Sequence, residues 1–445
     1  MASLNGTTGN KLEGSSYNIN PTLDVFATEP TNISVERSEY VVIRPDRLDP
    51  YGSIELTLSG STEHYTDLYN SFLQVEATVV QDDGSDITGN DDDAVVWMGD
   101  SMHTLFSELK MSIEGTTVEY ANNYGLRSYF SQLLENSAER KKYQGKMEGW
   151  LYDDSTSKDA ADHKTADKKK RRALIIGGKT IELTGKPHLA LFQQKKLIIP
   201  GPTMQLEFER ASGKLALFAA DEAPNGGAKI RIDKFELHLC KVKVNPTIQN
   251  SQLSLALEGH NYIYPVDRKR IKLYGIRAGV AQIDITLEEN KQKPKQIYLG
   301  LVNHNAMNGR FALNPYRMTH ANVDSIVLRV GDCPIGRRFE PNYARGIFGR
   351  EYHQFLHATG TLLEGDSLGI TKEQYLDGTT LYGFDLTGDF LKEGFHSMKN
   401  VTTSVEIRFS TNTTDGLSLV AYFVKDGVLE MDSILQLTIG GDAVL

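Results

Sequence analysis

Short runs in which apolar and polar residues alternate recur along almost the whole sequence, and they constrain the fold more than any other feature. Ile54, Leu56 and Leu58 alternate with polar neighbours, and a longer alternation fills residues 229–244. A period of two is typical of a β-strand that buries one face. Gly, Asn, Asp and Pro separate such runs at intervals of about 8 to 20 residues, which is the spacing of an all-β sandwich. The sequence therefore predicts an all-β fold.

The expected strands fall into two series. In the first half we expect them at residues 40–43, 53–58, 72–80, 109–113, 179–183, 188–192, 204–208 and 229–244. In the second half we expect them at residues 262–266, 270–275, 282–287, 296–302, 323–330, 380–386, 404–409 and 417–424. The two halves have a similar arrangement of expected strands but no similar sequence.

Each half also contains one stretch with helical periodicity. The apolar residues of 126–134 fall at i, i+3, i+4, i+7 and i+8, which is one stripe of an amphipathic helix. Residues 352–357 are helix-like in the second half. Residues 247–258 are a short helix or a connector, because leucines at every second position leave the period ambiguous.

The length of 445 residues is too great for one ordinary core and favours more than one domain. We predict a flexible arm over residues 1–22, a first sandwich over 23–246 and a second over 247–445, each sandwich carrying one short helix. The arm is small and polar and has few groups to bury. Residues 153–172 contain no apolar side chain larger than Ala, so we expect a long exposed or disordered loop there.

The composition excludes several classes of protein. Hydrophobic residues make up 40% of the chain and charged residues 24%, with a formal net charge of −10. This acidic balance argues against a surface devoted to nucleic-acid phosphates. The two cysteines, Cys240 and Cys333, are far apart, which favours reduced thiols in a cytoplasmic or nuclear setting. We expect no secretory signal in the first ten residues and no membrane span.

One strongly basic run stands out: Lys168, Lys169, Lys170, Arg171 and Arg172. It fits a nuclear-import signal or a contact with packaged nucleic acid, and it equally fits the solvated tip of the expected loop. The sequence leaves these interpretations open.

Two histidines have the spacing of metal ligands. His353 and His357 are at i and i+4, on one face of the expected helix. The zinc-protease pattern needs a Glu as general base after the first His, and Gln354 cannot take a proton. A structural or surface pair is the favoured interpretation.

Two further stretches match binding motifs only in part. Gly177, Gly178, Lys179 and Thr180 are similar to the end of a phosphate loop, but Ala173 replaces its first Gly and a strand pattern follows where a helix is required. The aspartates of residues 82–93 match no EF-hand spacing, so a solvated acidic loop is favoured over a calcium site. No Gly-x-Ser-x-Gly elbow is present. We therefore predict that the chain is not an enzyme and has no catalytic, cofactor-binding or metal-binding residues.

Several blocks of sequence carry a family resemblance through their number and order. They are residues 23–26, 60–68, 72–77, 105–109, 124–134, 301–309, 314–315 and 381–387. Together they resemble the hexon-type major capsid protein of Polinton (Maverick) elements and adintoviruses, from Leu23 to about Asp432. No role transfers to residues 153–172 or to the tail 433–445, where the sequence departs from the family.

The resemblance implies a double jelly roll, two eight-stranded sandwiches side by side. It implies a homotrimer that forms a pseudo-hexagonal capsomer of an icosahedral shell around double-stranded DNA, with no cofactor. Its partners would be neighbouring capsomers, penton and minor capsid proteins, with the genome contacted only indirectly. The protein would be made in the host cytoplasm, with the nucleus as an alternative place of assembly, and would reside in the virion capsid.

Two other classes remain as alternatives. Lectin domains also use jelly rolls, so a carbohydrate-binding or adhesion protein is one. It would need exposed aromatic platforms, and the chain has only two Trp, Trp97 and Trp150. A two-domain β enzyme is the other, and it would need a convergent acid and base set.

Overall fold

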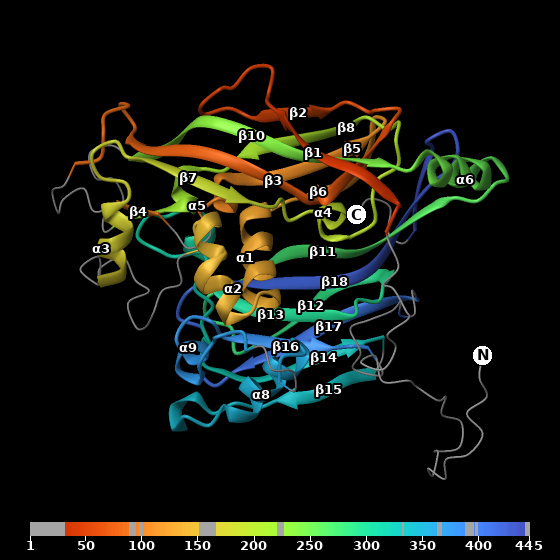
Figure 1. Cartoon of the computed structure of the whole chain (residues 1–445). Coiled ribbons are helices and arrows are strands. Elements are labelled where there is room, and N and C mark those ends of the chain that lie inside the picture. The colour runs from red at the N-terminus through yellow and green to blue at the C-terminus, as the bar shows by residue number, and fades with distance from the viewer. Residues whose placement is uncertain are drawn as a thin grey trace, which may run out of the picture.

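Four antiparallel sheets, paired into two sandwiches, form the frame of the molecule (Figure 1). The computed structural model describes residues 32–88, 95–97, 101–150, 166–219, 227–331, 333–362, 367–387, 396 and 399–440. The predicted arm at residues 1–22 lies outside this set. Alternation of buried and exposed residues explains the strands, as in β2 (Ile54–Leu58), whose apolar residues are buried and whose polar ones are exposed.

The strands of the first sandwich form two sheets of four. One has the order β1 (Val35–Ile43), β10 (Ala228–Val244), β3 (His64–Gln81) and β7 (Thr180–Gly185). The other has the order β2, β8 (Met204–Arg210), β5 (Phe106–Ile113) and β6 (Thr116–Ala121). A two-stranded ribbon, β4 (Val95–Trp97) with β9 (Leu217–Ala219), lies outside both sheets.

The second sandwich repeats this arrangement. One sheet has the order β11 (Tyr262–Ile276), β18 (Leu417–Met431), β13 (Gln296–Asn303) and β16 (Leu381–Asp385), with β19 (Leu437–Gly440) added on β18. The other has the order β12 (Gln282–Gln292), β17 (Asn400–Phe409), β14 (Val323–Val330) and β15 (Cys333–Phe339).

The order of the strands is the same in both sandwiches. Counting the eight main strands of each along the chain, one sheet runs 1-8-3-6 and the other 2-7-4-5. Every neighbouring pair is antiparallel. This is the connectivity of a jelly roll, in which paired sheets enclose the core. The predicted fold class, a double jelly roll, is confirmed.

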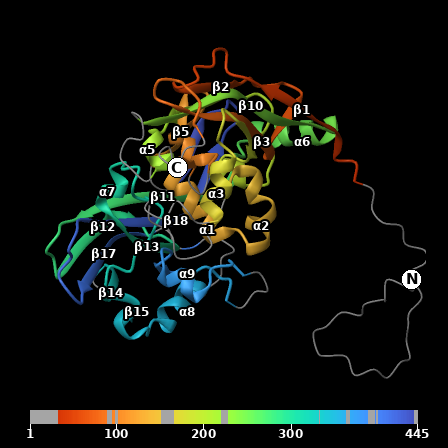
Figure 2. The same ribbon diagram turned by 90° about the vertical axis from the view of Figure 1, so that its left-hand side faces the viewer.

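The helices lie mainly in connections between strands. They are α1 (Tyr124–Glu135), α2 (Ala138–Tyr143), α3 (Ala166–Ala173), α4 (Ala190–Gln193), α5 (Gly213–Ala216), α6 (Pro246–Leu257), α7 (His304–Met307), α8 (Gly349–Ala358) and α9 (Lys372–Leu376). Short 3-10 turns are η3 (His103–Leu105), η4 (Gly145–Glu148) and η7 (Tyr343–Arg345). Figures 1 and 2 show α1 and α2 between the two sandwiches, and α6 at one end of the molecule.

Four expectations about local structure need correction. Residues 188–192 are not a strand but a loop and α4, because an uninterrupted apolar run does not distinguish the two. Strands expected at 262–266 and 270–275 are one strand, β11. Strand β15 was not expected, since Pro334 and Gly336 lower its strand propensity; it lies at a sheet edge, where Pro is tolerated. The loop expected at 153–172 ends as helix α3, because Ala, Lys and Arg favour helix even without an apolar face.

Two of the hydrophobic clusters cross between the sandwiches. The core of the first sandwich includes Tyr264 and Val266 from β11 and Leu429 and Met431 from β18. A second cluster joins α1 to strands of the second sandwich, and a third fills the inside of the second sandwich. The predicted division at residue 246 stays a prediction, and packing across it is extensive.

Candidate functional site

Helix α1 fixes the position of one sandwich against the other. Phe130 on α1 stacks on Tyr422 of β18, with ring centroids 5.5 Å apart. The hydroxyl groups of Ser131 and Tyr422 are hydrogen-bonded at 2.8 Å. Burial raises the pKa of Tyr422 well above its ordinary value, so this hydroxyl stays protonated and able to donate. The junction is therefore a packed and hydrogen-bonded contact rather than a flexible hinge.

The side chain of Lys141 forms hydrogen bonds across the same junction. Its Nζ donates to the carbonyl of Leu133, 2.6 Å away, and to the carbonyl of Leu368 in the second half, 3.0 Å away. Burial lowers the pKa of Lys141 to about 7, because a charged ammonium is poorly solvated there. The side chain links the end of α1 to the segment before α9.

A cavity of about 630 Å³ opens beside this junction. Its charged and amide lining comes from Glu135, Gln193, Gln194, Asp267, Lys269, Lys295, Gln296 and Asp426. Lys269 pairs with Glu135 at 2.7 Å, and Lys295 pairs with Asp267 and, at 3.3 Å, with Asp426. Although burial lowers the pKa of Lys295, the two aspartates raise it above its ordinary value. Because both lysines are paired with carboxylates from the other side of the junction or from neighbouring strands, the lining is suited to holding the two sandwiches together.

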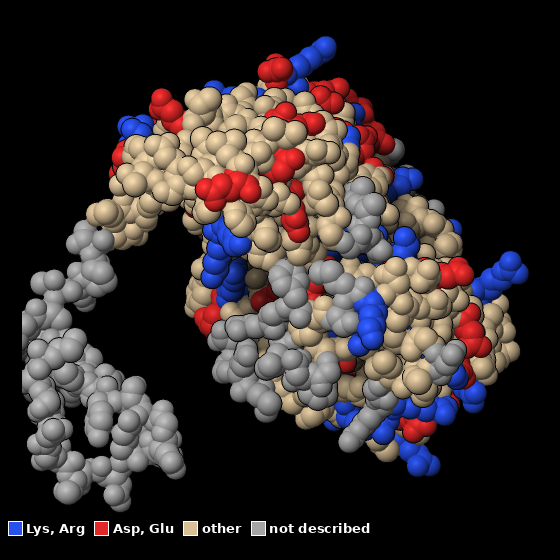
Figure 3. Space-filling view, turned by 90° about the vertical axis from the view of Figure 1, so that its right-hand side faces the viewer, with Lys and Arg blue, Asp and Glu red and all other residues tan. Residues whose placement is uncertain are grey.

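An apolar patch lies at the end of the molecule that carries α6. Its exposed members are Ile33, Val35, Leu253, Leu255, Leu257, Ile263 and Ile434. The backbone N–H of Asn245, which caps α6, donates to the carbonyl of Ser34 and holds the start of β1 at the N-terminal end of α6. Pairing of Tyr262 with Met431 places Ile263 near the turn after β18. We call these exposed residues the apolar end patch. Figure 3 shows this side of the molecule, where uncharged surface in the upper part is interrupted by scattered acidic side chains.

The apolar end patch is unusual in its exposure. Leu257 is 72% exposed and Ile434 is 77% exposed. Leu253 and Leu257, at i and i+4, lie on one side of α6, whereas Leu255 points to the opposite side. Exposed apolar residues that gather on one side mark interaction surfaces.

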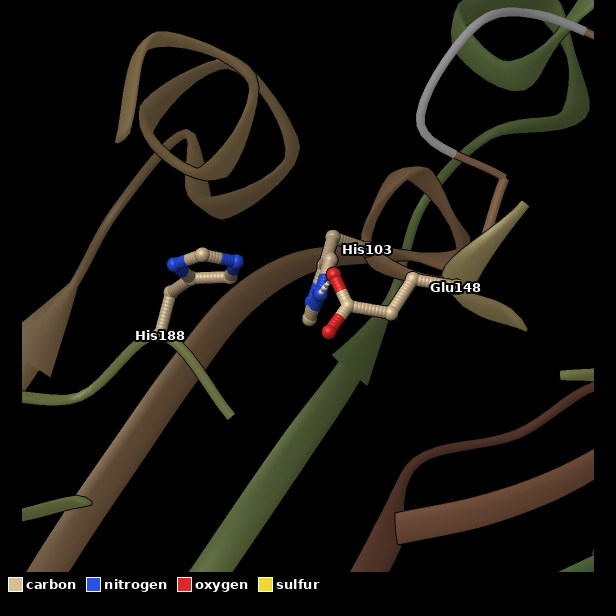
Figure 4. Close-up of side chains that lie close together, drawn as sticks. All are labelled: His103, Glu148 and His188. Carbon is tan, nitrogen blue, oxygen red and sulfur yellow. Dashed lines mark ion pairs between the residues drawn. The ribbon is translucent and has the colours of Figure 1, made fainter. Parts of the chain in front are cut away.

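A second candidate site is a group of three possible metal ligands that the sequence analysis missed. His103, Glu148 and His188 place one ligand atom each within 4.8 Å of the others. They come from three separate segments of the first sandwich, which Figure 4 shows converging. No spacing motif joins residues so far apart in the chain, so sequence alone carries no signal for the group.

The predicted basic run lies on a helix rather than on a loop tip. Helix α3 contains Lys168, Lys169, Lys170, Arg171 and Arg172. Lys169 and Lys170 are exposed, whereas Arg171 is buried. Only part of the run is therefore presented to a partner, and its role as an import signal or nucleic-acid contact stays a prediction.

The other sequence candidates are not brought together with further ligands. His353 is exposed and His357 is half-buried on α8, and neither belongs to a group of three metal-ligand residues in the described parts of the chain. After Gly177 and Gly178 the chain enters β7, not a helix, which argues against a phosphate loop. Of the acidic stretch 82–93, residues 89–93 lie outside the described residues.

Comparison with known proteins gives one sequence relative and several structural ones. No family model matches. An uncharacterized protein of Caenorhabditis elegans, F54H12.2, is 20% identical over 427 residues, covering 90% of this chain and 97% of that protein.

Among solved structures, that of the Sputnik virophage matches with a TM-score of 0.65 and 10% identity, covering 97% of this chain and 94% of that chain. The Faustovirus major capsid protein matches with a TM-score of 0.54 and 10% identity over 91% and 92% of the two chains. The mavirus major capsid protein matches with a TM-score of 0.51 and 11% identity over 99% and 97%. The chain thus shares over its length the double jelly-roll fold of these proteins. Among the described residues, every helix is too short or too polar to cross a lipid bilayer.

Proposed function

We propose that this chain is a viral major capsid protein, with a structural and not an enzymatic role. The observation that carries the proposal is the pair of jelly rolls with one shared strand order, held side by side by α1. Full-length similarity in fold to the major capsid proteins of Faustovirus and mavirus supports it. The resemblance in sequence to Polinton and adintovirus capsid proteins supports the narrower assignment to that group.

Three copies of a two-jelly-roll chain present six similar units. We propose that the chain forms a homotrimer whose outline is pseudo-hexagonal, so that one gene product tiles an icosahedral shell around double-stranded DNA. Such a subunit contact is permanent, and permanent interfaces are larger and more apolar than ordinary surfaces. Neighbouring capsomers, penton and minor capsid proteins would contact the remaining faces, and the location would be the virion.

The apolar end patch is the surface we assign to the contact between copies of the chain. A second copy would cover Leu253 and Leu257, which lie on one side of α6 and are exposed to water in the single chain. Burying apolar area stabilises association by about 25 cal/mol per Å² before the costs of association. A carbohydrate-binding role receives no support from the two Trp side chains, because Trp97 and Trp150 are both buried and offer no exposed platform.

Light scattering on a sizing column tests the trimer and its interface together. We expect the purified protein to have three times the 49.5 kDa mass of one chain. The variant Leu253→Glu/Leu257→Glu places two like charges on the same side of α6, in the contact, and should give monomers. The control variant Leu174→Glu makes the same change at an exposed leucine after α3, remote from α6, and should leave the trimer intact.

The outcomes separate the two parts of the proposal. A wild-type protein that stays monomeric at every concentration contradicts the capsomer. A trimer that survives the double substitution at α6 contradicts the assignment of the interface, while leaving the capsomer standing.

A further inference from the structure

The group formed by His103, Glu148 and His188 lies in the first sandwich, beside the junction helix. His103 lies on η3 and is buried, and Glu148 ends η4 with about 20% of its side chain exposed. His188 lies between β7 and α4, and the rings of His103 and His188 meet edge to face with centroids 4.4 Å apart. In Figure 4 the carboxylate of Glu148 points toward His103.

The backbone holds η3 and η4 together. The N–H groups of Ser101 and Met102 donate to the carbonyls of Gly149 and Glu148, at 3.4 and 3.0 Å. Gly149 has φ +79, and a Cβ there would lie 2.6 Å from that of Ser101, so only glycine allows this approach. A Cβ on Gly185 would lie 2.4 Å from Cγ of Glu148. Two glycines therefore create the space in which Glu148 reaches His103.

The surrounding hydrogen bonds orient the two rings. Nδ1 of His103 is 2.9 Å from the hydroxyl of Tyr124, and that hydroxyl also accepts the backbone N–H of His188 at 3.0 Å. A partner on Nδ1 directs Nε2 of His103 toward Glu148, 3.8 Å from its Oε2. Metal-binding histidines in proteins are oriented by partners of this kind on the other ring nitrogen. The side chain of Gln132 holds the same carboxylate by donating to Oε2.

Hydrogen bonding within the group does not account for its arrangement. A separation of 3.8 Å between His103 and Glu148 is too long for a hydrogen bond. Nε2 of His188 is buried and has no hydrogen-bond partner among the described residues. A buried ring nitrogen without a hydrogen-bond partner is placed to bind a metal ion.

We propose that His103, Glu148 and His188 bind one Zn²⁺ ion. Two imidazole nitrogens and one carboxylate oxygen are a zinc ligand set, and water fills the fourth position in such sites. Ca²⁺ and Mg²⁺ are disfavoured because they prefer oxygen ligands throughout. Zinc bonds of about 2.0–2.2 Å place tetrahedral ligands about 3.3 Å apart, so the side chains close by about 1 Å on binding.

The main effect that opposes binding is the positive charge nearby. Arg127 contacts the backbone carbonyl of His188, 2.6 Å away, but its charge is balanced by the buried carboxylate of Glu119. One carboxylate among the ligands leaves the zinc site with a net positive charge. We therefore expect a structural ion of moderate affinity, which ties η3, η4 and the segment after β7 together beneath α1.

The test measures metal directly and does not depend on assembly, so it is separate from the test of the capsid proposal. The full-length protein is loaded with Zn²⁺, dialysed, and analysed for metal by mass spectrometry. We expect about one zinc per chain, a higher midpoint of thermal unfolding than after chelation, and at least a tenfold weaker affinity in Glu148→Gln. The control His353→Gln changes an exposed histidine on α8 and should keep the full zinc content.

A spectroscopic measurement on the unaltered protein guards against misfolded variants. Co²⁺ bound to this ligand set should give the visible absorption bands of four- or five-coordinate cobalt, and Zn²⁺ should abolish them stoichiometrically. The proposal is overturned if the wild-type protein retains less than about a tenth of a zinc per chain and gives only the spectrum of aqueous cobalt. It is equally overturned if Glu148→Gln, His103→Gln and His188→Gln all bind zinc as the wild type does.

Discussion

The helices α1 and α8 occupy the same place in the two jelly rolls, yet they have opposite surroundings. Each follows the fifth main strand of its sandwich and precedes the sixth. Almost every residue of α1 is buried, including the polar Arg127 and Gln132, whereas α8 buries only Glu351, Phe355 and Ala358. Helix α1 packs between the two sandwiches, whereas α8 packs on its own sandwich.

Each half of the chain also contributes residues to a hydrophobic cluster of the other half. Helix α1 comes from the first half and packs with Tyr298 and Tyr422 of the second. In return, Tyr264 and Met431 of the second half complete the core of the first. Two units with the same topology are therefore interlocked at the junction. The two sandwiches therefore share their strand order but pack differently. Residues of both halves build the junction between them.

The largest expected loss of stability comes from removing the phenyl ring of Phe130 at the junction. Phe130→Ala should lower the free energy of unfolding by about 3–5 kcal/mol, the usual cost of deleting a buried phenyl ring. Phe130 is fully buried in the cluster that contains Tyr422. Because that cluster crosses the junction, hydrogen exchange should quicken in β13 and β18 of the second half as well as in α1. Loss of protection confined to the first half would show that the two sandwiches are not interlocked.

A smaller effect should depend on pH. Burial lowers the pKa of Lys141 to about 7, while the unfolded chain keeps the ordinary value of 10.5. Between these values the unfolded state binds the proton and the folded state does not, so stability rises with pH by up to about 1.4 kcal/mol per unit. Below pH 7 both states are protonated and this contribution stops changing.

The variant Lys141→Met isolates this contribution. Chemical denaturation from pH 7 to 9 should show that the wild-type protein gains stability relative to Lys141→Met as the pH rises. The neighbouring Lys142 is exposed, so Lys142→Met should run parallel to the wild type. Parallel profiles for all three proteins would mean that Lys141 is charged and solvated, and that its link from α1 to the segment before α9 is absent.

The smallest effect concerns a single hydrogen bond across the junction. Ser131→Ala removes the partner of the Tyr422 hydroxyl and should cost about 1 kcal/mol. A double-mutant cycle with Tyr422→Phe should give a coupling energy of about 0.5–1 kcal/mol between the two hydroxyl groups. A coupling of zero would show that the hydroxyl of Tyr422 depends on Glu135, 3.3 Å away, rather than on Ser131.

The sequence predicted the parts of the fold that local patterns determine. Alternation placed β2, β5, β8 and β10, and a stripe of apolar residues placed α1. The alternating leucines of α6 left a helix and a connector both open, and Asn245 as cap with Pro246 in the first turn favours the helix. The prediction failed at α3. The loop expected around Lys169 and Lys170 is in part a helix, because propensity prevailed over the lack of apolar residues.

The candidate sites were harder to predict, because both depend on contacts between distant segments. The apolar end patch combines the start of β1, the C-terminal half of α6, the start of β11 and the turn after β18. His103 and His188 meet only after β5 and β7 have taken their places in opposite sheets. A sequence pattern records neighbours along the chain, so neither site leaves a motif. The resemblance to capsid proteins pointed to the double jelly roll because many blocks kept their order.

Electron microscopy of the purified protein, imaged as it is concentrated, tests the central claim most directly. We expect six-lobed particles with three-fold symmetry that assemble into closed icosahedral shells. Single two-lobed particles at every concentration, with neither capsomers nor shells, would contradict the proposal that this double jelly roll is a capsid protein.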